Sequence, residues 1–380
     1  MASGLENLKI AIVADWLTDR GGAERVVLTL VSLFPRADIF TSVFKKENFP
    51  ELRGRRVITS FLQRWPLKFR HQLYLLLRPL AFEEFDLKAY DIVISSSSAE
   101  SKGIITLPET FHLCYCHTPT RYFWSHYKEY LGRPQLGFLN PLARFLMPLL
   151  IPRLRRWDFL AAQRVDQFVA NSQTTQERIK KYYQRESKVI HPPVESRRFE
   201  MGERGDYFII LGRQIPYKRT DIAIEAFNRL GLPLKVVGQG PELRRLMPQA
   251  RKNIQFIVGA NDRKVAELLR DARALIFPQE EDFGIVALEA QASGKPVIAY
   301  RAGGALESVI PGKTGVFFGE QTPESLILGI KKFARLSFKP ALIRQHAVSF
   351  DTSIFKRKFA KFLKESYIKY RTGMGLVPKI

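Results

Sequence analysis

The strongest constraint on the fold is that one rhythm of strands and helices occurs twice along the chain. Compact apolar runs with strand character, separated by helical patterns, stand at 8–14, 37–42, 90–97, 111–116 and 167–172. A second series of the same kind stands at 207–212, 234–238, 253–259, 272–278 and 295–300. Continuous apolar strands that alternate with helices are typical of parallel sheets covered on both faces. The chain therefore predicts an α/β protein with two doubly wound, Rossmann-like domains.

Paired prolines mark the joint between the two series. The segment HPPV, residues 191–194, can neither continue a helix nor pair as a central strand. We place the N-terminal domain at 1–192 and the C-terminal domain at 193–352. The remaining segment, 353–380, starts with a pattern that predicts an amphipathic basic helix. Because ligands of open parallel sheets bind beyond the carboxyl ends of the strands, we expect a central cleft that both domains face.

The formal net charge of +23 predicts a polyanionic partner. Nucleic acid, anionic lipid and a diphosphate substrate all fit that charge. The chain has no zinc-finger spacing, no RNP-type signature and no helix-turn-helix pattern, and its basic residues are not gathered in one arm. These observations do not favour nucleic acid, but composition alone does not choose among the three partners. We predict no nucleic-acid partner, and a nucleic-acid-binding protein driven by charge stays open as an alternative.

Two segments suit a membrane surface. Residues 67–82 and 141–157 both mix Leu and Phe with Arg, a combination found in helices that lie in a membrane interface. A core helix with a solvated basic face explains 67–82 equally well, whereas 141–157 favours the membrane. There is no uncharged apolar run of about 18 residues, no signal-peptide pattern and no disulfide framework. We expect a cytoplasmic protein, peripheral on the inner face of the cell membrane.

Two cations follow the first strand of the second series. Arg213 and Lys218 stand in the short loop GRQIPYKR, so both can converge on one anion. An arginine fork and a lysine point charge suit a diphosphate whose leaving negative charge must be stabilised. A solvated basic loop is the competing interpretation in so basic a chain.

The segment EEDFGIVALE contains two spaced acids at the end of a predicted strand. Glu281 lies in the turn before a helix, and Glu289 lies about two turns into that mostly apolar helix. The backbone N–H groups of Phe283, Gly284 and Ile285 stand at the helix start, where they could hold a phosphate. A carboxylate can accept hydrogen bonds from vicinal hydroxyls, so each acid could hold a sugar. A favourable helix-dipole contact explains Glu281 equally well, but a surface role explains Glu289 poorly.

The first half of the chain offers weaker signals. Gly21 and Gly22 directly precede a predicted helix. Glycine there lets the backbone approach a phosphate, but glycine is also common before helices that bind nothing. His117 follows the strand FHLCYC and could donate to a sugar hydroxyl or a phosphate. A histidine satisfied by backbone carbonyls is the alternative. The segment VGQGPEL lacks the third glycine of a dinucleotide fingerprint, which argues against a nicotinamide site.

Taken together, these motifs resemble the family 4 retaining glycosyltransferases, which have the GT-B fold. The resemblance rests on GRQIPYKR, VGQGPEL, EEDFGIVALEAQASGKPVIAYRAGGALESV and GKTGVFF. In the first half, DWLTDRGGAERV and YCHTPTRYFW resemble the bacterial mannosyltransferase branch of O-antigen and exopolysaccharide assembly. Gln279 departs from the pattern, since many relatives have a small serine-like residue there.

The resemblance implies a role for each matching residue. It implies that Arg213 and Lys218 bind the donor diphosphate and stabilise the leaving group. It implies that Glu281 lies close to the transferred sugar and that Glu289 binds the ribose hydroxyls. His117 matches a histidine near the donor sugar. The catalytic residues would be His117, Arg213, Lys218 and Glu281, whereas Glu289 would serve donor binding alone.

Further contacts are implied for the backbone. Phe283, Gly284 and Ile285 match the stretch that contacts sugar and phosphate, and Gly21–Gly22 match a loop that faces the phosphates. By the same resemblance the final helix packs back onto the N-terminal domain, which binds the acceptor. The fold needs no divalent metal, and no cofactor is expected.

The implied activity is the transfer of a hexose with retention of configuration, mannose from GDP-mannose above all. The acceptor would be a lipid-linked glycan or a polysaccharide in cell-surface glycan synthesis. Two alternatives stay open. A sugar-nucleotide epimerase of GT-B fold would turn over its donor with no acceptor, and a UDP-sugar-dependent transferase would use another donor base.

Overall fold

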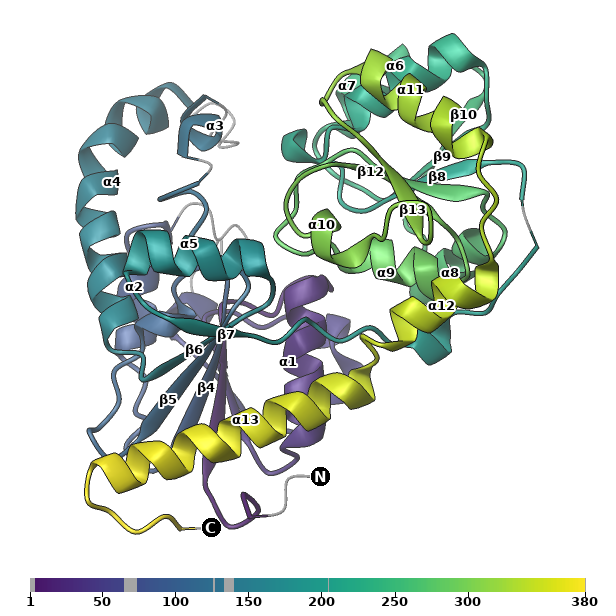
Figure 1. Ribbon diagram of the computed structural model, residues 1–380. Coiled ribbons are helices and arrows are strands. Elements are labelled where there is room, and N and C mark those ends of the chain that lie inside the picture. The colour runs from purple at the N-terminus through teal and green to yellow at the C-terminus, as the bar shows by residue number, and fades with distance from the viewer. Residues whose placement is uncertain (1–3, 65–73, 126, 133–139, 204, 380) are drawn as a thin grey trace. The chain divides into compact units, whose positions relative to one another are not determined.

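The chain divides into two compact units in the computed structural model, which describes residues 4–64, 74–125, 127–132, 140–203 and 205–379 (Figure 1). Unit 1 comprises Met1–His191 together with Phe355–Ile380, and unit 2 comprises Pro192–Ile354. Each unit is built around one parallel sheet, and each is described by itself below.

Unit 1 contains a seven-stranded sheet in the order β3-β2-β1-β4-β5-β6-β7. Its strands are β1 (Ile10–Ala14), β2 (Asp38–Thr41), β3 (Val57–Thr59), β4 (Ile92–Ser97), β5 (Phe111–Cys116), β6 (Gln167–Ala170) and β7 (Ser187–Val189). Its helices are α1 (Gly22–Leu33), α2 (Arg78–Glu83), α3 (Tyr127–Gly132), α4 (Asn140–Gln163), α5 (Gln173–Tyr183) and most of α13 (Thr352–Gly373). The order reverses between β1 and β4, which pair directly, so this is the topological switch point of the sheet.

The last helix, α13, contributes to the core of unit 1. Phe355, Phe359, Leu363 and Tyr367 recur every four residues, so they share one helix face, and all four are buried in the main core of this unit. That core also holds β1 and the apolar face of α1. Four of the five lysines of α13 lie between these positions, which explains how so basic a helix is anchored.

Unit 2 contains a six-stranded sheet in the order β10-β9-β8-β11-β12-β13. Its strands are β8 (Phe208–Leu211), β9 (Leu234–Val237), β10 (Ile254–Ile257), β11 (Ala274–Phe277), β12 (Val297–Tyr300) and β13 (Gly315–Phe318). Its helices are α6 (Thr220–Leu230), α7 (Leu243–Leu246), α8 (Asp262–Arg270), α9 (Ile285–Ala292), α10 (Ala305–Ser308), α11 (Pro323–Ala334) and α12 (Pro340–Val348). Its switch point lies between β8 and β11.

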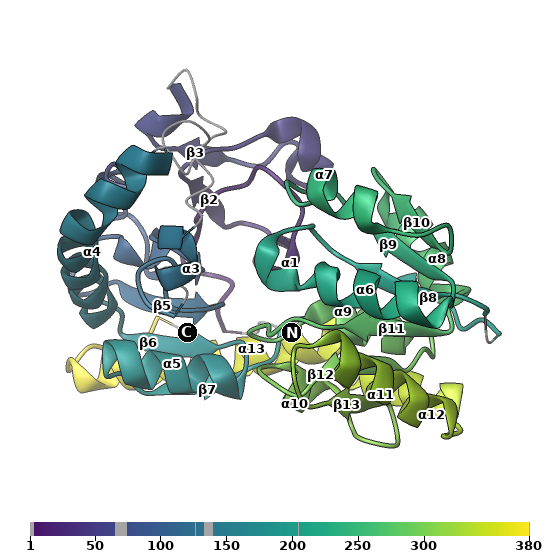
Figure 2. The same ribbon diagram turned by 90° about the horizontal axis from the view of Figure 1, so that it is seen from above.

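Helices cover both faces of the sheet of unit 2 (Figures 1 and 2). On β8, Phe208 and Ile210 pack into a core with α6 and α11, whereas Ile209 packs into a second core with α8, α9 and α12. Neighbouring strand residues point to opposite faces, so an uninterrupted apolar strand feeds both cores. The prediction of two doubly wound, Rossmann-like domains is confirmed.

Three strands were not among those predicted. β3 and β7 have only three residues each, and β7 includes an exposed lysine. β13 consists of the GVFF segment of the motif GKTGVFF. All three are edge strands, each with one partner strand in its sheet.

The segment 67–82 is only partly within the described residues, since 65–73 lie outside them. In the rest, Tyr74, Ala81 and Phe82 are buried, and Arg78 forms a buried ion pair with Glu100 at 3.3 Å. Arg78 therefore serves the interior of unit 1 and is not placed as a cation facing headgroups. None of the described helices combines the length and the apolarity needed to cross a membrane.

Candidate functional site

The cations and acids singled out in the second half of the chain gather at the switch point of unit 2. The loop after β8 carries Arg213 and Lys218, and the loop after β11 carries Glu281. Because β8 and β11 are paired neighbours, their carboxyl ends bring these two loops together. This is the position at which open α/β sheets bind their ligands.

Lys218 and Glu281 form an ion pair through the lysine Nζ and the carboxylate Oε1. Their side chains are 14% and 15% exposed, so the pair is largely removed from water yet still reachable. Lys218 ends a short 3₁₀ turn, η8 (Pro216–Lys218), which Pro216 starts by fixing its own φ. The pairing of opposite charges at this point means that an incoming diphosphate and the carboxylate would compete for Lys218.

Gln279 has a role that the sequence left unexplained. Its side chain is buried, and its amide Nε2 donates to Oε1 of Glu281 at 3.5 Å. Glu281 is thus held from two sides, by a cation and by an amide. Arg213 differs from both, because its side chain is exposed and has no hydrogen bond or ion pair within the described part of the chain.

Gly284 makes the turn into α9 possible. It is the N-cap of the helix and has φ +85°, a left-handed conformation that favours glycine. A Cβ at this position would also meet the ring of Phe277 at 2.6 Å. The backbone of Phe283, Gly284 and Ile285 therefore stands at the start of α9, while the Phe283 side chain is buried in a small core with Val194.

A second glycine brings the loop after β12 against this turn. A Cβ at Gly304 would lie 2.1 Å from the Cα of Phe283, and the N–H of Gly304 donates to the carbonyl of Glu281 at 2.8 Å. Larger residues would push the two loops apart. Gly304 lies in the AGGA segment, so it is one of the positions that hold the Glu281 backbone in place.

Glu289 is buried and anchored by a residue that sequence reasoning missed. Its Oε1 lies 3.3 Å from Nη2 of Arg198, whose Nη1 lies 3.0 Å from Oδ2 of Asp262. Arg198 is thereby shared between a buried and a half-exposed carboxylate, and its guanidinium also lies over the ring of Phe199. The signal in the sequence is only an Arg pair after the proline joint, which is common in a chain with 60 Lys and Arg residues.

The corresponding strand ends of unit 1 hold a different set of groups. His117 follows β5, is 8% exposed, and has its Nε2 2.8 Å from the hydroxyl of Ser96 on β4. Its backbone N–H donates to the carbonyl of Ser97 at 2.8 Å. The sequence predicted either a ligand or backbone carbonyls as the partner of His117, and did not predict Ser96. The Ser96 hydroxyl sets the orientation of the imidazole.

Asp15, directly after β1, ties the β1 end to the loop after β4. Its carboxylate accepts from the N–H groups of Ser98, Ala99 and Ser101 at 2.6, 3.0 and 2.8 Å, and from the Ser98 hydroxyl at 2.9 Å. Asp15 is therefore a structural anchor at the switch point of this sheet.

Gly21 and Gly22 lie at the start of α1, as expected, but with an acid beside them. The N–H of Gly21 donates to Oε2 of Glu24 at 2.9 Å, a capping arrangement. Burial raises the pKa of Glu24 to about 7, and nearby Asp15 and Asp19 add to the shift. One of the N–H groups predicted to face phosphates is thus already engaged by a carboxyl.

The structure therefore brings some predicted residues together and not others. Lys218 and Glu281 are in contact, Arg213 shares their loop region, and Glu289 lies farther along α9 in its own ion network. His117, Gly21 and Gly22 belong to unit 1 and are described apart from these. Within the described residues, no three His, Cys, Asp or Glu side chains lie close enough to hold a metal ion together.

Comparison with known families decides the class of the chain. Residues 20–198 match the family described as Glycosyltransferase Family 4, and residues 193–347 match Glycosyl transferases group 1. The chain is a glycosyltransferase of the GT-B fold.

Two relatives and one solved structure place this glycosyltransferase more closely. An uncharacterised glycosyltransferase of Methanocaldococcus jannaschii is 33% identical over 129 residues, which are 32% of this chain and 37% of that protein. D-inositol 3-phosphate glycosyltransferase of Geodermatophilus obscurus is 30% identical over 222 residues, 49% of either chain. The matched stretches thus span half of these relatives' lengths or less.

The structure of HepE from Anabaena in complex with UDP-glucose is similar over almost the whole chain. It has a TM-score of 0.68 at 17% identity, and the match covers 94% of this chain and 99% of that one. At this identity the similarity establishes the fold, with its two Rossmann-like halves.

Proposed function

We propose that this glycosyltransferase moves a hexose, mannose from GDP-mannose in the first instance, to a lipid-linked or polysaccharide acceptor in cell-surface glycan synthesis. The observation that supports it best is the set of groups at the switch point of unit 2. Lys218 and exposed Arg213 supply positive charge for a diphosphate, and Glu281 supplies a carboxylate for sugar hydroxyls. The motif resemblance of the first half favours mannose.

The proposed chemistry needs charge stabilisation above all. As the bond from the sugar to the diphosphate breaks, negative charge grows on the leaving group, and Lys218 and Arg213 offset it. Glu281 would exchange its ion pair with Lys218 for hydrogen bonds to the transferred sugar. Glu289 would hold the ribose of the nucleotide, with Arg198 fixing its orientation. No metal and no cofactor enter this proposal.

A donor panel tests the proposal. The protein is incubated with GDP-mannose, GDP-fucose, UDP-glucose or UDP-N-acetylglucosamine, with octyl glycosides as acceptors, and release of nucleoside diphosphate is followed. We expect acceptor-dependent release, greatest with GDP-mannose. Release no higher than that of a Lys218→Ala variant would overturn the transferase proposal. Conversion of a donor with no acceptor would favour an epimerase, and a preference for UDP-sugars would overturn GDP-mannose.

We further propose that unit 1 docks on the inner face of the cell membrane through α4, which runs along the left edge of both views (Figures 1 and 2). One face of α4 packs into unit 1 through Ile151 and Leu154. Another face exposes Phe145 and Leu149, 71% and 63% accessible. The exposed cations of this helix that support an anionic surface are Arg144, Arg153 and Arg156.

Because Phe145, Leu149, Arg153 and Arg156 are spaced by three or four residues, they share one side of the helix. This arrangement suits apolar insertion flanked by contacts between arginine and anionic lipid. Arg155 is not part of it, since its guanidinium packs over the rings of Trp124 and Tyr127 at 5.4 and 5.1 Å.

Vesicle co-sedimentation tests the membrane proposal. The double variant Arg153→Glu/Arg156→Glu should lose binding to phosphatidylglycerol vesicles, and wild-type binding should weaken as salt is raised. The charge-matched control, Lys331→Glu/Lys332→Glu on α11 of unit 2, should bind like the wild type. Equal losses in both variants would mean that net charge alone drives binding, and no loss in either would remove α4 from the proposal.

A further inference from the structure

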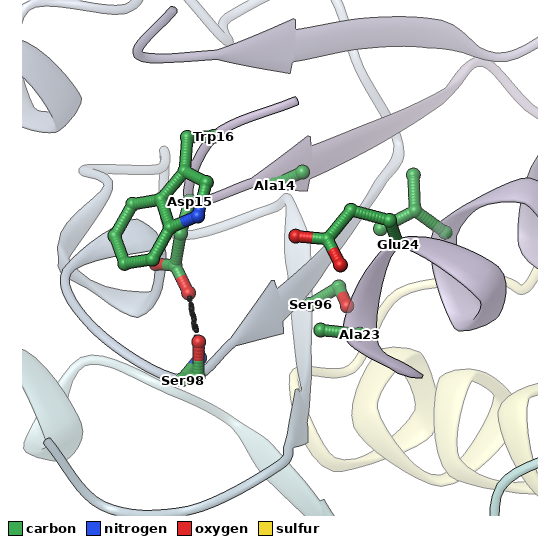
Figure 3. Close-up of a pocket in the computed structure, with 8 residues that line it drawn as sticks. Ala14, Asp15, Trp16, Ala23, Glu24, Ser96 and Ser98 are labelled. Carbon is green, nitrogen blue, oxygen red and sulfur yellow. Dashed lines mark hydrogen bonds between the residues drawn. The ribbon is translucent and has the colours of Figure 1, made fainter. Parts of the chain in front are cut away.

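A small polar pocket opens at the switch point of unit 1 (Figure 3). It is lined by residues from the end of β1, the first turns of α1 and the end of β4: Ala14, Asp15, Trp16, Ala23, Glu24, Val27, Ser96 and Ser98. The space suits a group of the size of a water molecule or a hydroxyl. Its lining combines carboxyl groups, hydroxyls and one indole, which are groups that can bind a saccharide.

The two carboxyl groups of this pocket are not equivalent. The carboxylate oxygens of Asp15 accept four hydrogen bonds from the loop after β4. Glu24 accepts one hydrogen bond through Oε2, from the N–H of Gly21, and its side chain reaches into the pocket from α1 (Figure 3). Glu24 is thus the carboxyl that enters the pocket from the helix, whereas Asp15 is held by the loop after β4.

The hydroxyls of the pocket are held in place by their partners. Ser98 donates to Asp15, and Ser96 shares a hydrogen bond with Nε2 of His117. Their positions are therefore preorganised, since each side chain is fixed before any ligand arrives. His117 acts on the pocket through Ser96 and is a positioning residue in this respect.

The charge of the pocket selects the kind of ligand. Asp15 and Glu24 supply the two carboxyl groups of the pocket, and none of its eight lining residues is basic. An anion would meet unfavourable charge here, although the chain as a whole carries +23. A neutral hydroxyl can donate to Glu24 at no such cost.

We propose that this pocket binds one hydroxyl of a neutral sugar, with Glu24 as its principal hydrogen-bonding group and the Trp16 ring beside it. The sugar would belong to the acceptor, so this part of the inference rests on the proposed transferase function. A Cβ at Gly21 would lie 2.7 Å from Oε2 of Glu24, so glycine at this position leaves room for the carboxyl. The pocket thereby defines an acceptor class: a terminal residue without charge.

A binding experiment without donor tests the pocket by itself. Saturation-transfer NMR titrations compare octyl mannoside, glucoside and galactoside with the 6-phosphates of the same sugars. We expect at least one neutral glycoside to bind, and its 6-phosphate to bind at least about 5-fold more weakly. Glu24→Ala should raise the dissociation constant of that glycoside about 10-fold, as expected for the loss of one hydrogen bond. Glu24→Gln, which keeps the shape, should raise it less.

The controls separate this inference from the function on which it rests. Glu47→Gln, at an exposed position of unit 1, should bind glycosides like the wild type. GDP and UDP affinities, measured by calorimetry, should stay within about 2-fold in both Glu24 variants. An equal loss of nucleotide affinity, or glycoside binding that ignores Glu24, would overturn the inference. If glycosides bind in a Glu24-dependent way but no donor is ever turned over, the transferase proposal fails and the pocket stands.

Discussion

The two sheets carry opposite chemistry at equivalent positions. In unit 2, the loops after β8 and β11 bring a lysine to a glutamate, beside an exposed arginine. In unit 1, the end of β1 and the start of α1 bring two carboxyl groups to two serine hydroxyls at the end of β4, and one of these hydroxyls contacts a histidine. The fold is the same in both cases, so it determines where a ligand is held, and the side chains determine which ligand. We propose a diphosphate as the ligand of the first site and uncharged hydroxyls as the ligand of the second.

The largest effect on donor turnover is expected when Lys218 of unit 2 loses its positive charge. Lys218→Ala should lower turnover of the preferred donor roughly 100- to 1000-fold, because negative charge on the leaving diphosphate loses its stabilisation. Release of nucleoside diphosphate under saturating donor measures this. The matched control is Lys252→Ala, at an exposed lysine of the same unit, and it should turn over the donor at the wild-type rate. Equal rates in the two variants would show that Lys218 serves the fold alone.

Neutralising the acid of the same pair should have the next largest effect. We expect Glu281→Gln to lower kcat about 30- to 100-fold while the dissociation constant for the nucleotide changes less than 3-fold, because the carboxylate is assigned to the sugar. Steady-state kinetics with calorimetry separates the two quantities. A large loss of nucleotide affinity with unchanged kcat would reverse this assignment.

Glu289→Gln tests whether the second acid serves the nucleotide. The variant should weaken GDP binding about 10-fold and leave kcat nearly unchanged, since a hydrogen bond of a carboxylate to ribose contributes to binding throughout the reaction. Thermal unfolding serves as the control, because Arg198 loses a buried partner in the same change. Unaltered GDP affinity would contradict the ribose assignment.

The smallest effect concerns Glu24 and the stability of unit 1. Its pKa is raised to about 7 from 4.5, so between these values the folded state retains a proton that the unfolded state releases. The free energy of unfolding should therefore fall from about pH 4.5 to about pH 7 and be flat above. Glu24→Gln should remove this component and be more stable than the wild type above pH 7, by roughly 1–2 kcal/mol after allowance for partial exposure.

Denaturant unfolding of wild type and variant across pH 4–9 measures the difference. Glu47→Gln should run parallel to the wild type at every pH. A constant offset between Glu24→Gln and the wild type would mean that Glu24 titrates alike in both states.

The sequence predicted the layers of the fold well and the partners of the site residues poorly. Strands such as β4 and β5 are recognisable in the sequence as local apolar runs, and the loops that directly follow them lie at the ligand-binding end of the sheet. The edge strands β3, β7 and β13 were missed; β3 and β7 are only three residues long, and each of the three pairs with a single neighbouring strand. Gln279 was noticed as unusual, and only its contact with Glu281 gave it a role.

By itself, the sequence determined that two parallel sheets form, that loops rich in glycine and charge follow their strands, and that Lys218 and Glu281 stand in such loops. Only the tertiary structure decided which groups meet. Arg198 contacts Glu289, which is 91 positions away in the sequence, and Ser96 contacts His117, which is 21 positions away. The physical reason is that a buried charge or imidazole must find a partner wherever packing brings one, and packing is a property of the whole unit. The pocket around Glu24, assembled from β1, α1 and β4, exists only at that level.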